Sequence, residues 1–321
     1  TVAENKMAAH VKSYTDGPAG AGIETAGMAL TAQDTSSINA FTDATAIAGS
    51  IGAVGVSVSF GVSVAINEID NEIEAYIFNA DNVVTTAAGH DLSIQAIENA
   101  TINATATAAA VSLAGGVFAG VSVSGGGATA TNIILGQTNA YVESSTLVSA
   151  GDVILSASNT SAINSLVAAA SASAGASVFA GVAVSIGASL ARNLIGCDFF
   201  AEAPIEVQAY ISNSSVKAGG DLIQTAVANE TLNALVTAGS VAVGGGIAGV
   251  AVPVAGAVSQ NRVATHISSY IDNPIGIGIE TGGNISLSAR DTSTITAFTN
   301  ATAVAGSIGA VFDCRVFTGG H

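Results

Sequence analysis

The chain has 321 residues, of which 49% are hydrophobic, only 9% charged and 5% aromatic, with no tryptophan and a formal net charge of −16. This apolar content excludes a disordered chain, and the excess of acids disfavours nucleic acid and anionic lipid as partners while permitting cations such as calcium. Ser, Thr and Gly interrupt every apolar run, so no segment is typical of a signal peptide or a membrane helix. We therefore expect no membrane insertion.

The chain repeats itself with a period of about 64 residues. An asparagine precedes the tyrosine of each copy, by nine residues in four copies and by seventeen in the copy that carries the insertion "GCDFFAEAP", residues 196–204. Such a period is typical of one supersecondary unit stacked on itself. All five tyrosines of the sequence occupy this one slot: Tyr14, Tyr76, Tyr141, Tyr210 and Tyr270.

Each repeat continues with a glycine turn and a short apolar alternation, as in "GHDLSIQA" at 89–96, and then with a long run of Ala, Gly and Val. In the run that begins at Thr101, small apolar residues alternate with Thr and Asn, and this period of two predicts strands in spite of the alanine content. Coils of roughly 20 residues would place three coils in each repeat, and wider coils fit the same period.

We predict an all-β fold: a parallel β-solenoid, or β-helix, of about four and a half repeats over residues 1–311. Like positions of successive coils should stack and form hydrogen-bonded ladders of Asn, Thr and Ser. Open solenoid ends expose unpaired strand edges, so we expect a homo-oligomer joined through these ends.

These segments carry a resemblance. The pattern "VSVAIN" followed by "EAYIFN", "GHDLSIQA" and "ATINATATAAA" resembles the repeat region of giant bacterial filamentous-haemagglutinin-like and leukotoxin-like surface adhesins. The resemblance implies an exported β-solenoid that serves as a stalk or a binding surface, located outside the cell or on the bacterial surface. It supplies no catalytic residues.

The last residues depart from the repeat. "FDCRVFTGGH" at 312–321 interrupts the last repeat before that repeat is complete. We expect this tail to be non-native, from a cloning junction or a shifted frame. A piece whose ends fall inside repeats is typical of a DNA library screened for activity, which gives weight to an enzymatic function.

The strongest polar pattern is "NEIDNEIEAY", in which Glu68, Asp70, Glu72 and Glu74 share one face of a strand, about 6.5–7 Å apart. One interpretation is a solvated outer face that discourages edge pairing. A second is a calcium site formed by Asp70, Glu72 and Glu74, the only cofactor that the sequence suggests. A third is a catalytic set of paired carboxylates, as in glycoside hydrolases.

The insertion at 196–204 is the second candidate site, because loops that project from a repeat scaffold often carry binding. Its candidate ligand-binding residues, with one residue that follows it, are Asp198, Phe199, Phe200, Glu202 and Glu206.

We expect the chain to be a structural and binding repeat segment of a secreted, adhesin-like bacterial surface protein. Its expected partner is a polysaccharide or a ligand on a host or cell surface. The alternative is a glycoside hydrolase that acts on polysaccharide through the paired carboxylates, although the lack of tryptophan counts against a sugar-stacking cleft. The sequence leaves open whether the protein is an enzyme.

Overall fold

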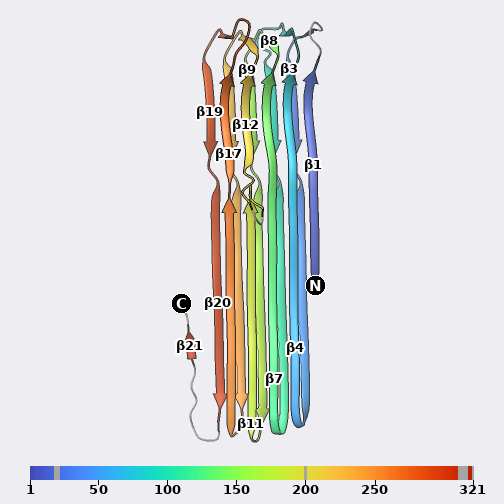
Figure 1. Ribbon diagram of the computed structural model, residues 1–321, viewed down its shortest axis with the longest axis vertical. Coiled ribbons are helices and arrows are strands. Elements are labelled where there is room, and N and C mark those ends of the chain that lie inside the picture. The colour runs from blue at the N-terminus through green and yellow to red at the C-terminus, as the bar shows by residue number, and fades with distance from the viewer. Residues whose placement is uncertain (18–21, 199–200, 310–316, 320–321) are drawn as a thin grey trace.

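The computed structural model describes residues 1–17, 22–198, 201–309 and 317–319, and these form strands without any helix. Within each repeat the chain runs along the long axis of the molecule, and successive repeats lie side by side (Figure 1). Repeats pair in parallel, so that each strand lies against the equivalent strand of the next copy. The predicted parallel β-solenoid is confirmed.

One repeat forms one coil. Tyr14 pairs with Tyr76, and Tyr76 pairs with Tyr141, so the sequence period and the structural coil are the same length. The sequence left narrow and wide coils open, and the structure has the wide coil. Small side chains allow two long walls to pack face to face, and a wide, flattened coil results.

The strands form three sheets, which are parallel except for the pairing of the last strand, β21 (Phe317–Gly319). The large sheet contains the long wall strands and one short strand near the C-terminus: β1 (Val2–Asp16), β4 (Ser37–Phe78), β7 (Thr101–Glu143), β10 (Ala162–Ser177), β11 (Ala180–Ile195), β12 (Ile205–Ser212), β15 (Thr231–Gly245), β16 (Ala248–Val263), β17 (Thr265–Asp272), β20 (Thr294–Ile308) and β21 (Phe317–Gly319).

Two five-stranded sheets close the wide end of the coils. One consists of β2 (Ile23–Thr25), β5 (Val83–Thr85), β8 (Thr146–Ser149), β13 (Ser215–Ala218) and β18 (Ile279–Thr281). The other consists of β3 (Met28–Asp34), β6 (Leu92–Glu98), β9 (Val153–Asn159), β14 (Leu222–Ala228) and β19 (Ile285–Asp291).

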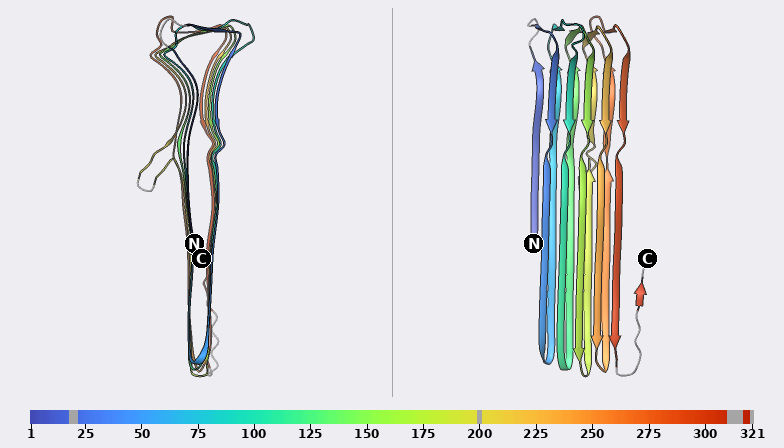
Figure 2. Two further views of the ribbon diagram at one scale, coloured as in Figure 1. Left: turned by 90° about the vertical axis from the view of Figure 1, so that its right-hand side faces the viewer. Right: turned by 180° about the vertical axis from the view of Figure 1, so that it is seen from behind.

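Seen along the solenoid axis, each coil is broad at one end and narrow at the other (Figure 2). We call the broad end the head. We call the narrow end the blade and define it by residues 41–64, 105–129, 166–190, 235–258 and 298–308. In the coil of β4 the chain passes down one wall, shifts register between Gly52 and Val54 at the tip, and returns along the other wall.

The two parts have different interiors. The head encloses a core of large aliphatic residues such as Ile69, Ile73 and Ile94, which are fully buried. The blade encloses mainly Ser, Ala and Gly, and hydroxyl groups link its walls, as in the 2.7 Å bond from Ser63 Oγ to Thr42 Oγ1. Val167 and Val236 are buried where the blade meets the head, and nearer the tip the walls lie too close together for large side chains.

The asparagine slot forms an internal ladder, as predicted. Each Nδ2 donates to the Oδ1 of the next coil, at 2.8 or 2.9 Å, from Asn5 through Asn67, Asn132 and Asn193 to Asn261. The middle members are fully buried. The register is thereby specified, because a slipped coil would leave buried amides without partners.

The tyrosine slot forms a stack on the outside of the head. The ring centroids of Tyr14, Tyr76, Tyr141, Tyr210 and Tyr270 follow one another at 4.7–5.1 Å, with the planes within 12° of parallel. Each ring face covers the next, so the inner rings present edges to solvent. Burial raises the pKa of the Tyr141 hydroxyl.

Replacing a central ring should destabilise the stack more than replacing a terminal one. Tyr141→Leu removes two stacked pairs and should lower the free energy of unfolding by about 1–3 kcal/mol, whereas Tyr14→Leu removes one pair and should lower it by about half as much. Urea unfolding followed by circular dichroism measures both. Equal losses in the two variants would show that stacking does not contribute.

The predicted tail, 312–321, lies outside the described residues except for Phe317–Gly319, which forms β21. This strand pairs antiparallel with Ala303–Ala305 of β20 and so departs from the parallel pattern of the repeats.

Candidate functional site

The four carboxylates predicted from "NEIDNEIEAY" lie on the outer wall of the head, on β4. Glu68, Asp70, Glu72 and Glu74 point outward, while the isoleucines between them are buried in the core. The alternation that the sequence predicted is present. Its function depends on what the neighbouring coils place beside each carboxylate.

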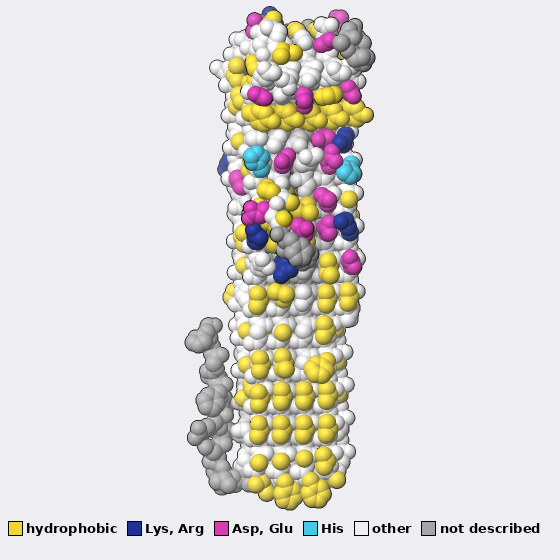
Figure 3. All heavy atoms as spheres, in the orientation of Figure 1, with side chains coloured by type: hydrophobic (Ala, Val, Ile, Leu, Met, Phe, Trp, Pro, Cys, Tyr) yellow, Lys and Arg dark blue, Asp and Glu magenta, His cyan; other side chains and the backbone are white. Residues whose placement is uncertain are grey.

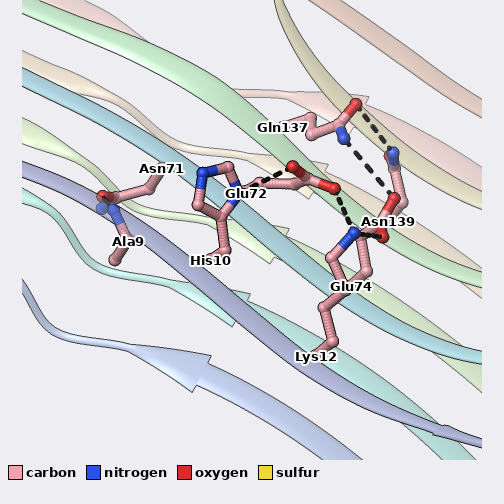
Figure 4. A network of polar contacts seen from close by, with 8 residues as sticks. All are labelled: Ala9, His10, Lys12, Asn71, Glu72, Glu74, Gln137 and Asn139. Atoms are coloured by element: carbon pink, nitrogen blue, oxygen red, sulfur yellow. Dashed lines mark hydrogen bonds and ion pairs between the residues drawn. The ribbon is translucent and has the colours of Figure 1, made fainter.

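The first coil places basic side chains beside three of these carboxylates. Lys6 Nζ lies 2.6 Å from Glu68 Oε1, and His10 Nδ1 lies 2.8 Å from Glu72 Oε2. Lys12 Nζ bridges two acids, at 2.5 Å from Glu72 Oε1 and 2.8 Å from Glu74 Oε2 (Figure 4). The repulsion within the acid row is therefore largely offset across the coil boundary.

The coil on the other side of β4 supplies amides. Gln137 Nε2 donates to Glu74 Oε1 at 3.4 Å, and Asn139 Nδ2 donates to Gln137 Oε1 at 3.5 Å (Figure 4). Asp70 differs from the other three acids, because its register neighbours are Ala8 and Leu135 and neither carries a charge.

These contacts disfavour Glu72 as a catalytic acid. The hydrogen bond from Lys12 lowers the pKa of the Glu72 carboxyl below its ordinary value, and the bond from His10 acts in the same direction. A glycosidase needs one carboxyl with a raised pKa to protonate the leaving group. Glu72 has the opposite shift.

The calcium interpretation gains no support from the geometry. In the part of the chain that the structure describes, no three His, Cys, Asp or Glu side chains form a group that could hold a metal ion. Lys12 occupies the space between Glu72 and Glu74, two of the proposed ligands.

The insertion lies on the same wall as the acid row. It leaves the wall between Ile195 and Glu206, where the preceding coil needs only Leu135 and Gly136 to connect the equivalent positions. In Figure 2 it stands away from the wall. The loop begins at Gly196, whose φ of 67° is favourable for glycine.

The described ends of the insertion are held by several contacts. Cys197 and Glu202 form an antiparallel bridge, and the Asp198 amide donates to the Ala201 carbonyl at 2.9 Å. Arg262 Nη2 lies 2.7 Å from Glu202 Oε1. Phe199 and Phe200, two of the predicted ligand-binding residues, lie outside the described residues.

The structure brings the two candidate sites together at one groove of about 540 Å³. The acid row contributes Asp70 and Glu72, and the insertion with the strand after it contributes Ala203, Pro204 and Glu206. Of the other candidates, Glu68, Glu74, Asp198 and Glu202 do not line this groove. The remaining lining residues are His10, Asn71, Leu135, Gly136 and Gln137.

Reasoning from the sequence missed His10 and Gln137. Both belong to a row that crosses the coils, in the order His10, Glu72, Gln137, Glu206 and His266. Each member stands four residues before the tyrosine of its repeat. The same alignment places Lys12 beside Glu74, and it would have predicted these contacts if one repeat had been equated with one coil.

A separate cluster of acids lies inside the head. Glu98, at the end of β6, is fully buried and accepts hydrogen bonds from Thr138 Oγ1 at 3.0 Å, Asn159 Nδ2 at 3.2 Å and Asn71 Nδ2 at 3.3 Å. Asn71 Nδ2 also donates to Asp34 Oδ2 at 2.9 Å. Burial raises the pKa of Glu98 to about 8, although the hydrogen bonds from Thr138 and Asn71 oppose this shift.

No protein-family model, curated protein or solved structure matches the chain. Among the described residues, no helix is long and apolar enough to cross a membrane.

Proposed function

We propose that the chain is a binding segment of an exported bacterial surface protein and that the groove on the head holds a polysaccharide or another cell-surface ligand. The convergence of the acid row and the insertion supports this proposal most. These two segments are the main departures from the repeat, and they lie far apart in the sequence, yet both line one groove.

The dimensions of the coil favour a binding surface over a spacer. Each repeat of about 64 residues advances the solenoid by one strand spacing, about 4.8 Å. A coil of 20 residues would give the same advance with a third of the chain. The wide coil instead provides two broad walls on which equivalent residues form long rows.

The chemistry of the groove suits a ligand that is rich in hydroxyl or amino groups. Asp70 and Glu206 supply carboxylate acceptors, and Gln137 supplies both a donor and an acceptor. Leu135 and Pro204 add apolar contact. Six of the ten lining residues are polar, which suits a hydroxyl-rich ligand better than an apolar one.

Binding to polysaccharides tests this proposal. The purified chain should be retained by at least one polymer of a panel of neutral and amino polysaccharides, and Asp70→Asn combined with Glu206→Gln should weaken binding at least tenfold. Glu24→Gln combined with Asp272→Asn makes the same chemical change at exposed positions outside the groove and should leave binding unchanged.

Reducing-sugar release in the same samples separates binding from hydrolysis. We expect none, because Glu72 is held as a carboxylate by Lys12. Release that Glu72→Gln abolishes would replace the binding proposal with the hydrolase alternative. Equal retention of the groove variant and the control variant would place the ligand elsewhere.

A further inference from the structure

The blade turns its largest side chains outward. On the wall that rises from the tip, valines of successive coils lie in register and alternate with inward-facing Ser and Gly. The exposed fractions of Val56, Val58 and Val62 are 57%, 52% and 56%. Two complete valine rows result, Val56–Val121–Val182–Val250 and Val58–Val123–Val184–Val252.

The opposite wall and the tip are apolar as well. Ile47 and Ile51 are 76% and 96% exposed, and Val241 is also exposed on this wall. Near the tip, Phe118 and Phe179 stack on each other with their ring centroids 6.0 Å apart. Rows of hydrophobic side chains cover the lower half of the face shown in Figure 3.

Charge is almost absent from the blade. Within the described blade residues, Asp43 is the one Asp, Glu, Lys or Arg. Above the blade, Figure 3 shows a belt of charged side chains. Glu68, Arg192 and Arg262 each follow a blade segment within four residues. An uncharged apolar surface of this size marks an interaction site with a protein or a membrane.

The height of the apolar zone matches the interior of a bilayer. On the wall of β4, Asp43 is the upper limit of the uncharged zone. The distance from Asp43 to the tip at Gly52 is about 30 Å at 3.3 Å per residue, and the hydrocarbon core of a bilayer is about 30 Å thick.

We infer that the blade inserts into the hydrocarbon of an electrically neutral lipid bilayer while the charged head stays in water. A protein partner, including a second copy of the chain, would cover one wall and leave the other wall and the tip exposed. Lipid covers both walls and the tip at once. The net charge of −16 favours zwitterionic over anionic lipid.

The backbone of the inner coils meets the main requirement of this environment. Strands β7, β10, β11 and β15 each pair with a neighbouring coil on both sides. Their N–H and C=O groups are therefore bonded within the sheet, as a segment in hydrocarbon requires. This proposal departs from the sequence-based expectation of no membrane insertion.

The outermost coils set a condition on the inserted state. The blade portions of β4 and β16 each pair with a neighbouring coil on one side only. A free strand edge is costly in hydrocarbon, so the inserted form should join copies, or further repeats, end to end. This joining is the end-to-end association that the sequence predicts.

Flotation with phosphatidylcholine vesicles tests the inference. The chain should float with the vesicles at both low and high salt, because apolar contact does not depend on ionic strength. Replacing Val121, Val123, Val182 and Val184 by Thr keeps the shape of the two rows and should reduce the bound fraction at least tenfold. The control replaces Val84, Val148, Ile154 and Ile223 on the outside of the head by Thr and should float like the wild type.

A single introduced tryptophan reports how deeply its position is inserted in the bilayer, because the chain contains no other tryptophan. Phe118→Trp places the indole near the tip of the blade, and Phe78→Trp places it on the outside of the head. Lipids with bromine on the acyl chains should quench the fluorescence of the Phe118→Trp variant and leave that of the Phe78→Trp variant unchanged.

Two outcomes would overturn the inference. One is quenching that does not distinguish the tip from the head. The other is a folded protein, by circular dichroism, that does not float but sediments as a dimer which the four Val→Thr substitutions dissociate. That result would assign the blade to contacts between copies of the chain.

Discussion

Raising the pH from about 5 to about 9 should lower the free energy of unfolding by up to about 5 kcal/mol, and Glu98→Gln should remove most of this dependence. The figure follows from the shift of the Glu98 pKa from 4.5 to about 8, at about 1.4 kcal/mol per unit. Burial is the main cause of the shift.

The direction follows from proton binding. With its pKa raised in the folded state, Glu98 keeps its proton in the native protein at neutral pH, whereas the unfolded chain has released it. The stabilisation is complete below pH 4.5, declines as the pH rises toward 8, and is lost above that value. The ionised form would place a negative charge near Asp34 and Glu230, which also disfavour it.

Urea unfolding at pH 5, 6, 7, 8 and 9 measures this effect. Glu98→Gln keeps the size and hydrogen-bonding capacity of the side chain while removing the titration, and exposed Glu24→Gln serves as the control. Burial also raises the pKa of Glu230, so a smaller slope of the same sign should persist in the Glu98→Gln variant. A pH slope that Glu98→Gln leaves unchanged would contradict the assignment.

The sequence predicts the ladders of this fold because stacking preserves position. Tyr14 and Tyr76 occupy the same slot of successive repeats, and in any solenoid whose coil divides the repeat such residues lie in one column. Asn67 and Asn132 follow the same rule. The period therefore predicts these rows without any knowledge of the cross-section.

The sequence period does not determine how many coils each repeat forms. Three narrow coils and one wide coil both align Tyr14 with Tyr76, and they differ only in which residues lie between the columns. The wide coil makes the first repeat the direct neighbour of the acid row, and only then does Lys12 reach Glu72 and Glu74. Unless one repeat is taken as one coil, the sequence does not predict a basic partner for the carboxylates of the acid row.

Alternation likewise shows that a strand has two faces and does not show which one is buried. In "GVSVSFGVSV" the usual rule would turn the valines inward. The structure turns Ser57 and Gly61 inward and Val58 outward, because the opposite wall is too near for a valine. The meeting of the insertion with Asp70 also depends on distances between coils that no local pattern records.

The close approach of the two walls of the blade predicts a second large effect of substitution on stability. Gly61, Gly126 and Gly187 form one inward row of the blade. A Cβ atom on Gly126 would lie 2.4 Å from the carbonyl oxygen of Ala170 on the facing wall, and its neighbours in the row meet the same obstacle. No side chain fits there unless the walls separate.

Gly126→Val should therefore lower the free energy of unfolding by about 3 kcal/mol or more, or prevent folding of the blade. Gly127→Val is the matched control, because its Cβ would point outward and meet Val62 Cγ2 at 3.9 Å, an ordinary contact. A β-branched residue suits an outward strand position, so this variant should be as stable as the wild type or slightly more stable.

Comparing the two variants isolates the effect of the short wall-to-wall distance on stability, because both variants make the same chemical change at adjacent positions. Urea unfolding gives the stability, and hydrogen exchange locates the loss, which we expect in the blade portions of β7 and β10. Equal stability of Gly126→Val and Gly127→Val would mean that the walls can part freely. The small inner side chains would then not be needed to hold the valines on the outside of the blade.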